Sequence, residues 1–230
     1  MKVTDWIKQN NIDTTLLLES VKCYDGVRSF EFESWNERRP QTIGTICDLL
    51  VKCWYCKSNL KEILGSYREY RLKEHFKISI QRKFDLEAVT QAGLLVLSKG
   101  YVELKNKDFS IICNMMEESF DVLNKMIGTV VSSECEVKYY SGSTRKGTIT
   151  IGTPDLIVNN MLFEFKVSRS NTLQPSWVLQ ITIYYCLILL TKYHKCILES
   201  RDKGKEYLNW CSCHDIKRIV IYNFLNGNYY

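Results

Sequence analysis

The fold is decided by the stretch Thr150-Ile-Gly-Thr-Pro-Asp155-Leu-Ile-Val-Asn-Asn-Met-Leu-Phe-Glu164-Phe-Lys166, in which two apolar runs flank the pair Asn159-Asn160. Asparagine tolerates a positive φ angle, so this pair is typical of a two-residue hairpin loop. Folding the chain there places Asp155 opposite Glu164 on one face. Lys166 shares that face because side chains alternate along a strand. The stretch therefore predicts a β-hairpin with three charged side chains converging at one end.

Two carboxylates that converge in this way need a compensating cation. They repel each other, so one of them would hold a proton unless a positive charge lay between them. Mg²⁺ prefers oxygen ligands and is often bound through one or two carboxylates, so Asp155 and Glu164 are candidate metal ligands. Lys166 could salt-bridge the pair or orient an attacking water. The alternative is a structural Asp-Lys-Glu cluster, which is costly in a half-buried sheet without a ligand.

A second polar pair lies within the apolar segment 175–190. Its first residue, Pro175, suits the first turn of a helix, and the segment is too short and too interrupted to predict a membrane span. We therefore predict a buried helix. Gln180 and Tyr184 are four residues apart and project from one face of it. Buried polar side chains need partners, which either the charged face of the hairpin or the nearby backbone could supply.

Taken together, Gly152-x-Pro-Asp155, Glu164-x-Lys166 and Gln180-x-x-x-Tyr184 resemble the motifs of the PD-(D/E)XK nuclease superfamily. The Gln-x-x-x-Tyr helix is similar to that of its RecB-like and phage lambda exonuclease-like branch, and the resemblance covers residues 110–225. It implies a hydrolase of DNA phosphodiester bonds, an exonuclease, that requires Mg²⁺ or Mn²⁺. The residues that it implies for catalysis are Asp155, Glu164, Lys166, Gln180 and Tyr184. Two alternatives stay open, an RNA endonuclease of the same fold and a nucleic-acid-binding module without turnover.

Members of this family often carry a further acidic residue on the helix before the first core strand, where it completes the metal site. The predicted helix 109–127 carries Glu117 and Glu118. Glu118 lies along the edge of the apolar stripe, whereas Glu117 points further outward. Glu118 is therefore the predicted third ligand, and the alternative is that both glutamates are exposed. His75 is another candidate, since some RecB-like nucleases place a metal-binding histidine on an earlier helix.

The sequence and the resemblance together predict an α/β fold with a small mixed central β-sheet flanked by helices, a restriction-endonuclease-like core. Residues 109–230 are the predicted nuclease core, and residues 1–108 form a mainly helical part packed on it. A helix is expected over residues 42–64, with Thr42 or Thr45 as its N-cap. Strands are expected at residues 135–140, 148–157, 195–199 and 217–224.

Composition limits the class of protein. The chain has 230 residues and a net charge of +5, a mild excess that permits polyanion binding. The N-terminus lacks the basic-then-apolar pattern of a signal peptide, so we expect an intracellular protein that is not secreted. The ten cysteines are then reduced thiols and not a disulfide framework. Alternatively, Cys53 and Cys56 with Cys211 and Cys213 could bind zinc or an iron–sulfur cluster, although their spacing departs from the family pattern.

Several residues are candidates for contacts with the phosphates of a nucleic acid, the expected partner, with DNA preferred. Arg39 comes just before the predicted helix 42–64, and helix N-termini bind phosphate well. An ordinary solvated basic turn is the alternative there. Ser168 and Arg169 follow the hairpin at a strand end, where phosphate contacts would be useful. No membrane partner is expected.

Overall fold

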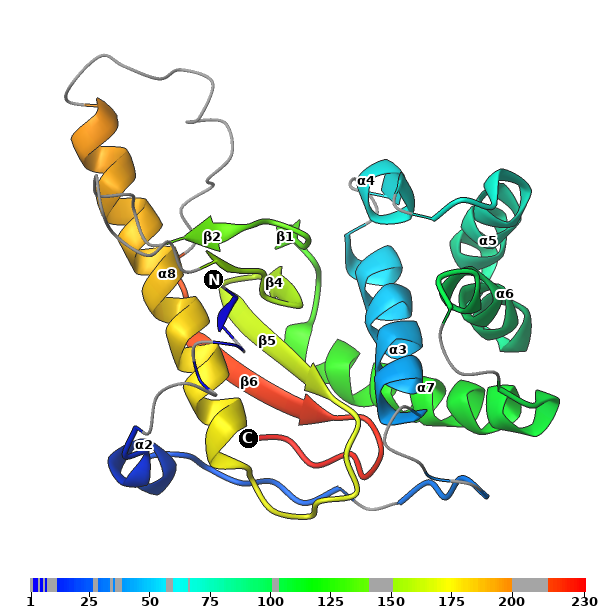
Figure 1. Ribbon diagram of the computed structural model, residues 1–230, viewed down its shortest axis with the longest axis horizontal. Coiled ribbons are helices and arrows are strands. Elements are labelled where there is room, and N and C mark those ends of the chain that lie inside the picture. Colours follow the sequence, from blue (N-terminus) through cyan, green and yellow to red (C-terminus); the bar gives the residue numbers. More distant parts are fainter. Residues whose placement is uncertain are drawn as a thin grey trace.

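The computed structural model describes the chain except for residues 1, 4, 6, 8–11, 27–28, 34, 36–38, 57–59, 66, 101–103, 141–150 and 200–214, and the side chains of 62, 140 and 192–199. Helices in the N-terminal half are followed by a four-stranded mixed sheet that is packed against helices (Figure 1). The predicted α/β class is therefore confirmed. Figure 1 shows α8 on one side of the sheet and α3 and α7 on the other.

The helices that precede the sheet are α2 (Thr15–Glu19), α3 (Arg39–Tyr55), α4 (Leu60–Gly65), α5 (Tyr70–Arg82), α6 (Leu86–Leu97) and α7 (Asn106–Ile127). The helix predicted over residues 42–64 is thus divided into α3 and α4. It also begins earlier than predicted, because Pro40 fits the first turn of a helix and α3 forms around it. A long helix, α8 (Pro175–Glu199), follows the hairpin. No helix in the described part of the chain is long and apolar enough to cross a membrane.

The hairpin has the register that the sequence predicts. Strand β4 (Leu156–Val158) runs antiparallel to β5 (Met161–Lys166), and Leu156 pairs with Phe163. The φ angles of Asn159 and Asn160 are 47° and 64°. Both loop residues are therefore left-handed, as a two-residue turn that matches the strand twist requires.

The rest of the sheet forms around this hairpin in the order β1-β4-β5-β6. Strand β1 (Ser133–Glu134) pairs antiparallel with β4, and β6 (Arg218–Asn223) pairs parallel with β5. Parallel neighbours need a crossover connection, which α8 supplies. Glu164 therefore lies on the face of β5 toward α8, whereas Phe163 and Phe165 pack into the larger core with α3 and α7.

Three predicted strands differ from the structure. In the described part of residues 148–157, the predicted single strand is divided into β3 (Ile151–Gly152) and β4, with a break at 153–155. Residues 135–140 do not form one strand, because Glu136 has a φ angle of 60° and turns the chain between β1 and β2 (Tyr139–Tyr140). Strand β2 pairs instead with β3 in a separate two-stranded ladder. Residues 195–199 are not a strand but the last turns of α8. A short apolar run does not by itself distinguish a strand from the continuation of a helix.

Gly152 explains how β3 can approach α8 so closely. A Cβ atom at this position would lie 2.6 Å from Cδ1 of Tyr184 and 2.8 Å from Cδ1 of Leu187. A side chain there would force α8 away from the strand. The glycine of the Gly-x-Pro-Asp motif thus helps to hold Tyr184 against the sheet.

Candidate active site

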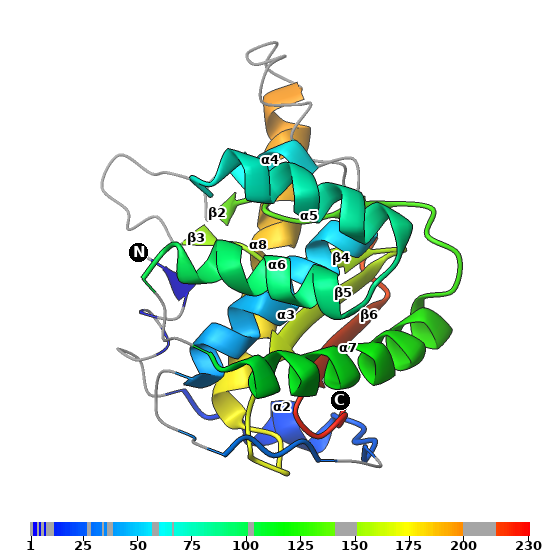
Figure 2. The ribbon, with the colours of Figure 1, turned by 90° about the vertical axis from the view of Figure 1, so that its right-hand side faces the viewer.

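A cavity of about 220 Å³ lies where α3 crosses the carboxyl end of β5. Figure 2 shows α3 in front of the hairpin, between it and the outer helices. Asp48 of α3 lines the cavity together with Asp155, Glu164 and Lys166. The remaining residues of its wall are Gln41, Gly44, Thr45, Phe165, Val167 and Phe224. The three charged residues that the hairpin pattern predicted to converge therefore do so, and α3 adds a fourth.

Glu164 is the most deeply buried of these charged groups, with 3% of its surface exposed. Its Oε1 atom accepts a hydrogen bond from Nζ of Lys166 at 2.6 Å, whereas Oε2 is buried and has no hydrogen-bond partner among the described residues. The pKa of this carboxyl is raised to about 8, chiefly by burial and also by the neighbouring Asp155, while Lys166 acts in the opposite direction. An ionised Glu164 is thus left with an unsatisfied oxygen at the cavity.

Asp155 is held by the backbone of the opposite strand. The β4–β5 ladder ends at Leu156, and Oδ2 of Asp155 then accepts a hydrogen bond from the backbone N–H of Phe165 at 2.7 Å. The carboxylate thus replaces the next ladder bond and is fixed at the hairpin end. Burial raises its pKa, while the nearby Lys52 opposes that rise.

A second charged cluster, which the sequence motifs did not predict, is brought to the same place by α3. Nζ of Lys52 lies 2.7 Å from Oδ2 of Asp48, one helical turn earlier, and 2.7 Å from Oε1 of Glu136. Burial raises the pKa of Asp48 to about 7 even though Lys52 lowers it, and its Oδ1 atom is buried without a hydrogen-bond partner. Burial lowers the pKa of Lys52, but the carboxylates around it outweigh this effect and raise the pKa above its ordinary value.

A signal for this cluster is present in the sequence. Asp48 and Lys52 are four residues apart in the otherwise apolar run 46–53, in which every residue except the half-buried Asp48 is buried. Charged residues are rarely buried unless they are paired. An i, i+4 pair inside an apolar helix therefore indicates either a structural ion pair or a site.

Lys166 is connected to α8 through Gln180 and Tyr184. Oε1 of Gln180 accepts a hydrogen bond from Nζ of Lys166 at 2.9 Å, and Nε2 of Gln180 donates to the Tyr184 hydroxyl at 2.9 Å. The two acceptors Glu164 and Gln180 occupy two of the three N–H groups of the ammonium. The predicted meeting of the helix pair with the charged face of the hairpin is therefore confirmed, and it fixes the direction of Lys166.

The charges in this region do not balance. Four carboxyl groups, those of Asp48, Glu136, Asp155 and Glu164, surround two lysines, Lys52 and Lys166. Full ionisation would leave two negative charges uncompensated in a largely buried cluster. Either protons or a divalent cation would remove that excess, because buried charge is costly without a partner.

The donor atoms fit a divalent cation in their chemistry. Hard cations take carboxylate oxygens, and the cluster offers two buried oxygens without partners, Oε2 of Glu164 and Oδ1 of Asp48. In the described residues, however, no three His, Cys, Asp or Glu side chains are placed so that they could hold a metal ion as they stand. Binding would thus require side-chain rotation that turns Asp48, Asp155 and Glu164 toward one point.

Stability should depend on pH in a direction set by these raised pKa values. Asp48 and Glu164 hold protons up to about pH 7 and 8 in the folded state, but lose them near 3.8 and 4.5 when exposed. Ionisation of the two carboxyls therefore opposes folding. Their contribution to the free energy of unfolding is highest below pH 4 and is lost as the pH rises toward 8. The melting temperature should fall over this range by about 2–4 °C for each kcal/mol lost.

Thermal melts in chelator at pH 5.5 and 8 would measure this fall. The Asp48→Asn, Glu164→Gln double variant is the control and should show a smaller one. Mn²⁺ should restore the melting temperature at pH 8 much more than at pH 5.5, because bound protons compete with the metal. An equal slope in the double variant would contradict the assignment.

Two residues predicted as possible metal ligands do not reach the cavity. Glu118 on α7 lies near Tyr222 and does not line the cavity, so the geometry does not support it as a ligand. Its neighbour Glu117 is exposed. His75 on α5 is exposed and contacts Glu87 of α6. Asp48 is instead the third acidic residue that lines the cavity.

The burial of Arg39 does not support its prediction as a nucleic-acid contact. The residue is 5% exposed, and its Nη1 atom lies 3.3 Å from Oδ1 of Asp108. Asp108 also accepts a hydrogen bond from the backbone N–H of Lys105 at 2.8 Å. Arg39 thus joins the start of α3 to the start of α7, because a buried guanidinium needs a carboxylate partner.

Two further candidates lie in the loop after β5. Oγ of Ser168 accepts a hydrogen bond from the backbone N–H of Ser170 at 3.1 Å, so its hydroxyl serves the loop itself. Arg169 is exposed and its guanidinium lies 4.8 Å from the ring centre of Trp35. Contact of either residue with phosphate stays a prediction.

The cysteines in the described residues are free thiols. Cys53 and Cys56 are buried on and just after α3, and burial raises the pKa of the Cys53 thiol above its ordinary value. Such a thiol resists the deprotonation that metal binding requires. Cys211 and Cys213 lie outside the described residues, so the four-cysteine site stays a prediction.

Comparison of the chain with models of protein families, with curated proteins and with solved structures finds no match.

Proposed function

We propose that this protein is a metal-dependent nuclease that hydrolyses phosphodiester bonds in DNA, acting at the cavity between α3 and the hairpin. One observation carries the proposal: Asp48, Asp155, Glu164 and Lys166 line one small cavity, and two of the carboxylates keep buried oxygens without partners. The sequence motifs resemble those of a nuclease family on three of these four positions. Asp48 supplies the third acid that the resemblance requires.

Asp48, Asp155 and Glu164 would hold the ion, Mg²⁺ or Mn²⁺. A bound divalent ion polarises the scissile phosphate and lowers the pKa of its water. The excess negative charge of the cluster supports a cation as its partner. Lys52 would keep Asp48 ionised and directed toward the hairpin, because its ammonium lies 2.7 Å from Oδ2.

Lys166 would position the attacking water and stabilise the charge that develops on the phosphate. Its hydrogen bonds to Glu164 and Gln180 fix the ammonium, and the third N–H group is the one that would meet the reacting atoms. Gln180 and Tyr184 are then positioning residues that act through Lys166. Such a donor needs both its positive charge and a fixed direction, because a misplaced donor stabilises the reacting atoms less.

The proposal is tested with purified protein and end-labelled DNA in the presence of Mg²⁺ or Mn²⁺. Linear duplexes should be shortened from their ends, and covalently closed circles should be spared, because an exonuclease needs a terminus. Chelator should abolish the activity. Rapid cutting of closed circles would indicate an endonuclease, and cleavage of RNA alone would favour the RNA endonuclease.

The non-catalytic alternative makes a different prediction in the same assay. Binding of labelled DNA without any cleavage, in both metals and over pH 6 to 9, would identify a nucleic-acid-binding module. In that case Lys166 and Glu164 would be a structural ion pair. The complete set of three carboxylates and one lysine at the cavity favours the enzyme.

A further inference from the structure

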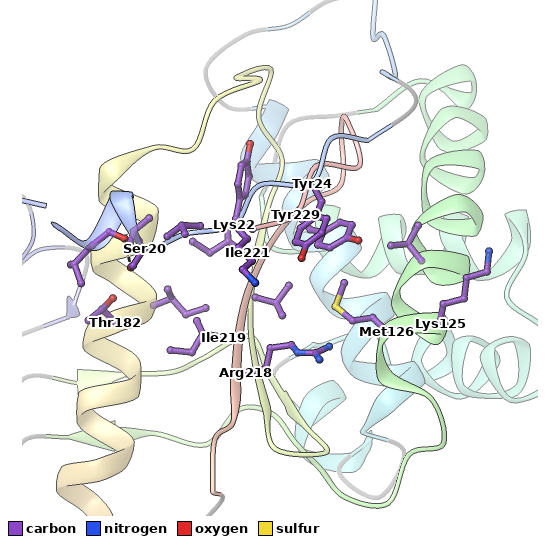
Figure 3. Close-up of a pocket in the computed structure, with 17 residues that line it drawn as sticks. Ser20, Lys22, Tyr24, Lys125, Met126, Thr182, Arg218, Ile219, Ile221 and Tyr229 are labelled. Carbon is purple, nitrogen blue, oxygen red and sulfur yellow. Dashed lines mark hydrogen bonds between the residues drawn. The ribbon is translucent and has the colours of Figure 1, made fainter. Parts of the chain in front are cut away.

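A groove with a volume of about 1020 Å³ runs along the edge of the sheet, at the side of β6 that faces away from β5. Figure 3 shows Arg218, Ile219 and Ile221 of β6 between Thr182 of α8 and Met126 of α7. No residue is shared between this groove and the cavity at Asp48 and Glu164. It is therefore a separate feature that the proposed nuclease reaction does not use.

The groove carries positive charge on an apolar lining. Lys22, Lys125 and Arg218 are exposed along it, and none of its lining residues is Asp or Glu. In the described part of the chain, none of the ion pairs within 4 Å involves these three residues. A surface of one sign attracts a partner of the other sign. The partner that fits this groove is thus anionic.

The backbone of β6 presents an edge at the base of this groove. Ile221 exchanges two hydrogen bonds with Tyr230, at 3.1 and 3.0 Å, on the side away from β5. Ile219 points its N–H and C=O groups to that same side, because these groups alternate along a strand. No backbone bond to Ile219 on that side occurs among the described residues, and the residue is 38% exposed. Such an edge accepts an added strand.

We propose that the groove binds an extended acidic segment of a protein partner, which pairs with β6 at Ile219 as an added strand. Alternate side chains of the segment would face the two walls. Those toward α7 would meet Lys125 and Arg218 and should be acidic. Those toward α8 would meet Val178 and Ile181 and should be apolar.

A protein segment fits this groove better than a single-stranded nucleic acid. Nucleic-acid grooves combine positive charge with aromatic rings on which bases stack. Three tyrosines line this groove: Tyr24 and Tyr229 stack on each other, with ring centres 4.7 Å apart, and Tyr230 packs partly buried against the core on the α8 side. The N–H and C=O groups of Ile219 need an acceptor and a donor side by side. Another main chain supplies both, and a sugar-phosphate backbone does not.

The test uses the full chain and a library of random peptides. Peptides selected for binding should carry Asp or Glu at alternate positions, with apolar residues between them. A fluorescein-labelled selected peptide is then measured by fluorescence anisotropy. The Lys125→Glu, Arg218→Glu variant should bind it at least about tenfold more weakly, since like charges suppress association. N-methylation of alternate peptide amides should abolish binding, because it removes the donors that pair with β6.

Matched controls keep the result specific. The Lys77→Glu, Arg82→Glu variant changes the same charge at exposed positions on α5 and should bind as wild type does. Asp155→Asn should also bind normally, so that a failure of the nuclease proposal leaves this inference intact. Equal melting temperatures would show that the charge-reversed variants are folded.

Three results would overturn the inference. The first is a selection that yields no acidic alternating sequence. The second is peptide binding that stays as tight when the protein carries the Lys125→Glu, Arg218→Glu change, or when the peptide is N-methylated. The third is displacement of the peptide by poly-dT, together with loss of poly-dT binding in the Lys125→Glu, Arg218→Glu variant. That result would make the groove a nucleic-acid site.

Discussion

Asp48→Asn should abolish metal-dependent DNA cleavage, with a loss of at least about 10²- to 10³-fold in the single-turnover rate. Asp48 lines the cavity with Asp155 and Glu164, and a neutral amide cannot replace a charged oxygen ligand. The fold should survive, because the amide oxygen can still accept the hydrogen bond from Lys52. Removing a carboxyl whose pKa burial raises to about 7 also removes a cost of folding at neutral pH.

Single-turnover rates at saturating Mn²⁺ and Mn²⁺ affinity by calorimetry would measure this effect. Glu118→Gln is the matched control, since Glu118 lies on α7 beside Tyr222 and away from the cavity. It should keep both the rate and the affinity of the wild type. A fully active Asp48→Asn would remove α3 from the site, and an inactive Glu118→Gln would restore the ligand predicted from the sequence.

The parts of the site that the sequence predicted are those that local rules determine. The hairpin register follows from the turn preference of Asn159-Asn160 and from strand alternation, and both act over a few residues. The meeting of Gln180 and Tyr184 with Lys166 follows from helical periodicity and from the need of buried polar groups for partners. The register of the hairpin does not depend on how the rest of the chain packs, and the contact with Lys166 requires only that α8 packs on the preceding strand β5.

The parts that were missed depend on long-range packing. A helical wheel gives the direction of Glu118 around its own helix, but not where that helix packs relative to the cavity. Asp48 lies far earlier in the chain than Asp155, and only the packing of α3 across β5 brings the two together. Arginine commonly contacts phosphate, but the packing of α7 places Arg39 in a buried ion pair with Asp108.

Lys166→Arg should lower the single-turnover rate by about 10²-fold or more, the scale on which single transition-state donors act. Arginine keeps the charge but replaces a compact ammonium by a wide planar fork. The site holds the ammonium at 2.6 Å from Glu164 and 2.9 Å from Gln180, which leaves little room for that fork. Mn²⁺ affinity should change little, because an ammonium is not a metal ligand.

A purely structural role for Lys166 predicts a different pattern. Loss of the ammonium would then leave Glu164 unpaired at 3% exposure, and activity would fall only as the folded fraction falls. Melting curves measured beside the rates at pH 8 separate the two cases. Gln180→Leu adds a further readout, because it frees one N–H group of Lys166 without touching either charge. It should slow cleavage less than Lys166→Arg does and leave Mn²⁺ affinity unchanged. Cleavage at the wild-type rate by Lys166→Arg would refute the catalytic role.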